Sequence, residues 1–167
     1  MNGLNDPTFL TAWIISNIIG VLILWAAFKR PKWARLALFL VFAVACWINY
    51  TTAQQSPEVY LSYSEYSVQV YQDFINGWFS SNISTMVSLI AIGQGMIAIG
   101  MILRGWWVKM ACIGAIVFLL AIAPLGVGSG FPFPFVVALA AWFILQKREK
   151  GYIWQRNNRS KENSAPN

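Results

Sequence analysis

The sequence predicts an all-α fold: a polytopic membrane helix bundle with five transmembrane helices plus one outer interfacial amphipathic helix. The composition, the lengths of the apolar runs and the positions of the basic residues lead to this prediction. Of the 167 residues, 57% are hydrophobic and 11% are charged, whereas a soluble domain carries about 25% charged residues. We therefore expect a membrane protein in which residues 1–146 form a single transmembrane helical domain.

The composition also argues against several kinds of site. The chain has no histidine, which removes a common ligand of haem and zinc and the commonest general base. Its formal charge of +6 does not indicate nucleic-acid binding, because the basic residues form short clusters between apolar runs. Cys46 and Cys112 each lie inside an apolar run and are expected to act as small apolar residues. Neither a catalytic constellation nor a metal site is predicted.

The clearest transmembrane segment is residues 83–103, a run of 21 residues without a charge. At about 1.5 Å rise per residue, such a helix crosses a hydrocarbon layer roughly 30 Å thick. Arg104 and Gly105 interrupt the run, and a second apolar run follows at once, so the two helices should form a hairpin and pack side by side. The five predicted spans are residues 8–28, 33–50, 83–103, 106–123 and 131–146.

Small residues recur on one face of the segment 83–103, at spacings of three and four. Faces of this kind allow helix backbones to approach closely in a bilayer, where no hydrophobic effect drives helices together. Ala111, Gly114 and Ala115 offer a matching surface on the next span. The predicted packing residues of the first helix are Ser84, Ser88, Ala91, Gly95 and Ala98.

All twelve basic residues fall in three regions, namely residues 29–35, the hairpin turn at 104–109 and the tail from Lys147 onward. With five spans these regions lie on one side of the membrane, and the positive-inside rule makes that side the cytoplasm. The amino terminus is then outside and the carboxyl terminus cytoplasmic. The tail, residues 147–167, is basic and polar and is predicted to be disordered.

Residues 57–75 are predicted to form the interfacial helix. Ser56 and Pro57 are typical of a helix start, and Gly77 is typical of a stop. At about 100° per residue, the acids share one arc and the tyrosines lie opposite. Glu65 and Asp73 are the outer-face candidates for chemistry. Acids that share such an arc more commonly point into water than form a catalytic pair.

Three polar residues in or beside the spans are candidate functional groups. Gln94 lies near the middle of the third span, and Asn17 in the first span could be its partner. Intramembrane polar groups often mark function, but an amide more commonly makes a structural interhelical hydrogen bond. Arg104 could bind an anionic head group, although a residue in this position more often serves as a topology anchor.

The third and fourth spans resemble the DoxX-like family of small bacterial integral membrane proteins. The likeness lies in the core sequence IAIGQGMIAIG, the Arg104 that ends the helix and the Ala/Gly-rich helix that follows. It covers about residues 33–145, and the family commonly has an acidic residue near the position of Gln94. The resemblance implies a bacterial inner membrane. It also implies a quinone as a cofactor candidate, since some members of the wider family are subunits of quinone-linked oxidoreductases.

Three functions remain open from the sequence. The first is an accessory or scaffold subunit of the inner membrane, beside a quinone-linked redox system and another membrane protein subunit. The second is a carrier or channel for a small neutral solute, lined by Asn17, Gln94 and glycines. The third is a lipid- or quinone-modifying enzyme at the outer interface that uses Glu65 or Asp73. The lack of catalytic groups in the sequence favours a function other than catalysis.

Overall fold

The computed structural model describes residues 7–147 and 152–154. All regular secondary structure in these residues is helical. The bundle helices are α1 (Pro7–Lys29), α2 (Pro31–Gln55), α4 (Ile83–Ile102), α5 (Trp106–Ile122) and α6 (Phe133–Gln146). The connections contain the 3₁₀ helices η1 (Pro57–Tyr66), η2 (Phe79–Ser81) and η3 (Ala123–Ser129) and the short helix α3 (Gln69–Asn76). The predicted all-α bundle is confirmed.

Helices α1, α2, α4 and α5 are each long and apolar enough to cross a membrane, and α6 is a shorter apolar helix of 14 residues. Large apolar side chains cover the outside of the bundle; Leu40, Leu89 and Met96, for example, are 53%, 60% and 69% exposed. Exposed apolar surface on this scale is stable against lipid and not against water. The chain is therefore a multi-pass membrane protein.

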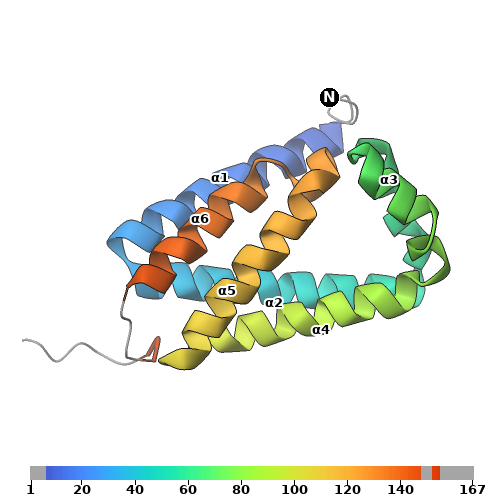
Figure 1. Ribbon diagram of the computed structural model, residues 1–167. Coiled ribbons are helices and arrows are strands. Elements are labelled where there is room, and N and C mark those ends of the chain that lie inside the picture. Colours follow the sequence, from blue (N-terminus) through green and yellow to red (C-terminus); the bar gives the residue numbers. More distant parts are fainter. Residues whose placement is uncertain (1–6, 148–151, 155–167) are drawn as a thin grey trace, which may run out of the picture.

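The bundle helices form a ring in which each packs against its neighbours in the order α4, α2, α1, α6, α5. Helices α2 and α4 run alongside each other, as do α1 and α6 (Figure 1). Helix α5 leaves the end of α4 at an angle, so the predicted hairpin is closely packed near its turn and open further away (Figure 1). At the turn, a Cβ atom on Gly100 would lie only 2.7 Å from the Cβ of Ala111.

The small residues of α4 contact α2 as well as α5, the partner that the sequence suggested. A Cβ atom on Gly95 would meet the Sγ of Cys46 at 3.2 Å, and the hydroxyl of Ser88 accepts a hydrogen bond from Gln54 at 3.0 Å. Ala91 and Ala98 are buried, whereas Ser84 is exposed. The hairpin connection therefore does not restrict the small residues of α4 to α5, because α2 also packs closely against α4.

Replacing Gly95 with leucine should lower the stability of the bundle by about 1–3 kcal/mol, because the larger side chain must displace Cys46 from its place on α2. The adjacent Met96 is 69% exposed on the lipid-facing side of the same helix, so Met96→Leu is the matched control. Thermal unfolding of both variants in one detergent measures the difference. Equal stability would show that the close approach of α2 and α4 at Gly95 contributes nothing.

Helix α2 is longer at both ends than predicted. It begins at Pro31, two residues before the predicted start, so Pro31 and Lys32 belong to its first turn and the connection to α1 is Arg30 alone. Proline at the first helical position explains this start, since its missing N–H group needs no partner there. The helix continues to Gln55 because no breaker occurs before Pro57, which disfavours helical geometry in the residue before it.

The predicted interfacial helix is interrupted. Between η1 and α3 the backbone of Ser67 and Val68 is extended, and the N–H of Val68 donates a hydrogen bond to the carbonyl of Pro124 at 3.2 Å. This contact with η3 diverts the chain, so a single arc calculated at 100° per residue does not describe the segment. The predicted stop is correct, since Gly77 ends α3. We refer to residues 57–81 as the cap segment.

Opposite charges lie at opposite ends of the bundle. The side chain of Arg35 at the start of α2 binds carbonyls at the end of α4, and Lys147 after α6 binds carbonyls at the end of α1. These contacts bring the basic residues at the start of α2 and after α6 together at one end of the bundle. The acids of the described residues, Glu58, Glu65 and Asp73, all lie in the cap segment at the other end. The predicted disorder of the tail concerns residues that, apart from 147 and 152–154, lie outside the described ones.

Candidate functional site

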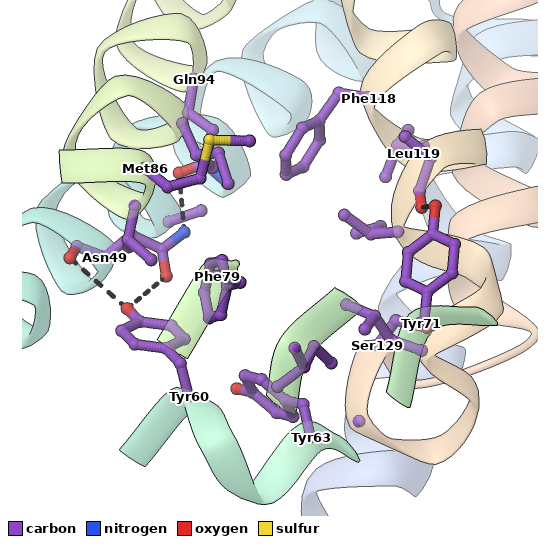
Figure 2. Close-up of a pocket in the computed structure, with 18 of the residues that line it drawn as sticks. Asn49, Tyr60, Tyr63, Tyr71, Phe79, Met86, Gln94, Phe118, Leu119 and Ser129 are labelled. Carbon is purple, nitrogen blue, oxygen red and sulfur yellow. Dashed lines mark hydrogen bonds between the residues drawn. The ribbon is translucent and has the colours of Figure 1, made fainter. Parts of the chain in front are cut away.

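A chamber of about 700 Å³ lies between α2, α4 and α5 under the cap segment. It occupies the space that opens where α5 diverges from α4, and Figure 2 shows the side chains that surround it. Its inner end is closed by Phe42 and Phe118, whose ring centroids are 5.9 Å apart. Its volume falls in the range of about 300–1,000 Å³ that is usual for small-molecule sites.

The lining is almost entirely apolar and contains no charged residue among those described. Aromatic and aliphatic side chains from the helices form the inner walls, and the cap segment supplies tyrosines and further apolar groups (Figure 2). Charged ligands are disfavoured in such a space, because a charge without a partner loses its hydration. The inner walls include Val41, Phe42, Ala45, Val87, Ile90, Phe118, Leu119 and Ile122.

One wall carries a chain of three hydrogen-bonded polar side chains (Figure 2). The hydroxyl of Tyr60 donates to Oδ1 of Asn49 at 2.9 Å, and Nδ2 of Asn49 donates to Oε1 of Gln94 at 2.8 Å. Burial raises the pKa of Tyr60 above the usual value for a tyrosine, so the phenol stays protonated and remains a donor at physiological pH. The chain therefore begins on η1, crosses α2 and ends on α4.

The chamber is open beside α3. Val70 and Phe74 line it and are nevertheless 74% and 43% exposed. Between α3 and α5, the hydroxyl of Tyr71 donates a hydrogen bond to the carbonyl of Ala121 at 2.6 Å and so connects the two sides of the opening (Figure 2).

The suggested pairing of Asn17 with Gln94 is wrong. Asn17 donates its Nδ2 hydrogens to the carbonyls of Trp13 and Gly130, at 2.9 and 3.1 Å, and so ties α1 to the segment before α6. Gln94 makes its interhelical hydrogen bond with Asn49 on α2. The pairing fails because α1 and α4 are not neighbours in the ring, whereas α2 and α4 are.

The other candidate residues lie away from the chamber. Glu65 and Asp73 are exposed, and Asp73 accepts a hydrogen bond from Gln69 at 2.9 Å. Arg104 is exposed at the turn between α4 and α5, with its guanidinium carbon 5.0 Å from the ring centroid of Tyr152. Within the described residues, no three side chains of the metal-binding types lie together.

Sequence reasoning missed Asn49, Tyr60 and Arg35. Asn49 is not among the residues singled out from the sequence, although its position inside an otherwise apolar run was an available signal. Tyr60 was expected only as part of an apolar face. Arg35 is counted only among the basic residues that set the orientation, although the predicted span 33–50 includes it.

The fold and the chamber together define an all-α, multi-pass membrane protein with an apolar, ligand-sized space under a cap of short helices. Comparisons with family models, curated proteins and solved structures find no match for this chain. The resemblance to the DoxX-like family stays a prediction.

Proposed function

We propose that this protein binds a lipophilic molecule from the bilayer in the chamber and acts as an accessory subunit of an inner-membrane system. The chamber is the observation that carries the proposal. It has about 700 Å³ of space, an uncharged apolar lining and an opening beside α3, where Val70 is 74% exposed. A stable bundle has no need of such a space, because an unfilled cavity loses the contacts that its lining could make.

The ends of the bundle suggest which side of the membrane the opening faces. The basic residues that the structure describes gather at the end away from the cap segment, so the positive-inside rule assigns the cap segment to the outer side. The molecule would then enter from the outer leaflet. A quinone, which the DoxX-like resemblance implies, is one molecule of the proposed class.

The two alternative functions have less support. A carrier for a small polar solute would need a polar path, and the lining offers few polar groups besides Asn49, Gln94 and the tyrosines. An interfacial enzyme using Glu65 or Asp73 would need these carboxylates beside its substrate, and both are exposed on the cap segment and absent from the chamber lining.

A tryptophan at position 90 should prevent binding, because Ile90 lines the chamber and the larger ring would fill part of it. The adjacent Leu89 is 60% exposed on the outside of α4, so Leu89→Trp is the matched control. Mass spectrometry of lipids that co-purify with each protein in mild detergent measures the effect. We expect a specific bound molecule with wild type and Leu89→Trp, and its loss with Ile90→Trp. Identical lipid content in all three proteins would contradict the proposal.

A further inference from the structure

The hydrogen-bonded chain on the chamber wall has a defined direction. Because the phenol of Tyr60 donates to Oδ1 of Asn49, the amide of Asn49 must turn its Nδ2 toward Gln94. Gln94 in turn presents Oε1 to Asn49, which leaves its Nε2 on the other branch of the amide. Each donor in the chain is thus oriented by the one before it, from η1 through α2 to α4.

The Nε2 group of Gln94 has no hydrogen-bond acceptor among the described residues. The side chain is only 3% exposed and lines the chamber. Every fully enclosed side-chain nitrogen or oxygen in the described part of the chain has a partner, so Nε2 keeps some accessible surface, and the space that Gln94 lines is the chamber. Two N–H donors of a nearly buried amide therefore face an apolar space, an arrangement that is costly unless something accepts from them.

We infer, on the basis of the proposed function, that Gln94 donates a hydrogen bond to a neutral acceptor of the bound molecule, such as a ketone or ester carbonyl. Asn49 and Tyr60 are positioning residues that hold the amide in this orientation. An anionic acceptor is disfavoured, since the described lining contains no cation to offset its desolvation. The apolar body of the molecule would lie against the apolar lining of the chamber, which includes Phe42, Ile90 and Phe118.

A pair of probes tests this inference. Propionyl-dimethylaminonaphthalene is a neutral ketone whose emission shifts to longer wavelength when its carbonyl accepts a hydrogen bond, and dimethylaminonaphthalene lacks the carbonyl. Both are titrated into purified full-length protein in detergent, and the signal of Ile90→Trp is subtracted to remove probe held by the micelle. Wild type should bind the ketone about three- to tenfold more tightly than the carbonyl-free probe, the gain expected from one hydrogen bond.

Gln94→Met keeps the length and volume of the side chain and removes the donors. We expect this variant to bind the two probes with equal affinity and to shift the emission of the bound ketone to shorter wavelength. Retained binding of the carbonyl-free probe shows that the chamber is still folded. Tyr60→Phe should shift the ketone emission part of the way, because the phenol then no longer orients the amide of Asn49.

Two results would overturn the inference in different ways. If Gln94→Met binds the ketone with wild-type affinity and emission, Gln94 does not recognise the carbonyl, while the proposed chamber function stands. If wild type binds neither probe above the level of Ile90→Trp, both the inference and the proposed function fail. The emission of the ketone bound to wild type is a separate check, because emission typical of a carbonyl without a hydrogen bond would exclude the contact whatever the variants do.

Discussion

Replacing Arg35 with methionine should destabilise the protein by about 2–4 kcal/mol, because it leaves buried carbonyl groups without donors. Arg35 is fully buried at the start of α2. Its Nε donates to the carbonyl of Met101 at 2.9 Å, and its Nη2 donates to the carbonyl of Leu103. Met101 lies in the last turn of α4 and Leu103 directly follows its end, where the last carbonyls have no backbone donors and the helix dipole favours a positive charge.

The measurement is thermal or denaturant unfolding of purified protein in one detergent. Arg30 belongs to the same basic connection, and its side chain is exposed, so Arg30→Met removes an equal charge without uncovering carbonyl groups and should change stability by less than about 0.5 kcal/mol. Arg35→Lys should fall between the two, since an ammonium group cannot reproduce the planar fork of a guanidinium. Equal stability of Arg35→Met and Arg30→Met would show that the buried contacts of Arg35 do not stabilise α4.

Gly126→Ala should destabilise the protein by about 2–4 kcal/mol and release the cap segment from η3. Gly126 has φ of 62° and ψ of −127°, a conformation that residues with a Cβ atom rarely adopt. A Cβ atom there would also lie 2.6 Å from the carbonyl oxygen of Tyr66, at the end of η1. Both the backbone strain and the steric clash should lower the stability of the Gly126→Ala variant.

Gly105 provides a control that separates these two causes. It has nearly the same conformation, with φ of 60° and ψ of −120°, but nothing lies within 4 Å of its Cβ position. Gly105→Ala should therefore lose only the strain energy, about 1–3 kcal/mol. Unfolding curves of the two variants and their protease sensitivity in the cap segment measure the difference. Equal losses, with no added sensitivity in Gly126→Ala, would mean that the contact between η1 and η3 does not hold the cap.

The chamber depends on features that the sequence indicated only in part. Tyr60, Tyr63 and Tyr71 line the chamber, although the segment is not the single helix on which they were predicted to share a face. The break at Ser67 and Val68 was not predictable from periodicity, because it follows from a hydrogen bond to Pro124, which lies far away in the sequence. Local propensity describes a segment in isolation, and a distant backbone acceptor overrides it.

The partners of buried polar residues also depend on contacts between distant parts of the chain, which the sequence does not reveal. An amide in an apolar run must find a partner, so the sequence correctly marked Gln94 as a residue that makes an interhelical hydrogen bond. The partner itself could not be chosen between Asn17 and other amides without knowing which helices touch. The structural role of Arg35 could not be predicted for a related reason, since the carbonyl groups that allow its burial are known only from the fold.

The sequence by itself determined the membrane-spanning class, the approximate spans and the separation of basic from acidic residues along the chain. These properties follow from local hydropathy and charge, because the bilayer imposes a fixed span length and requires every backbone group to be satisfied within a helix. Only the tertiary structure decided that α4 packs on α2, that Gln94 meets Asn49 and that a chamber opens beside α5. Helices in lipid choose their neighbours by close fit between side chains, and that fit exists only once the whole ring of helices has assembled.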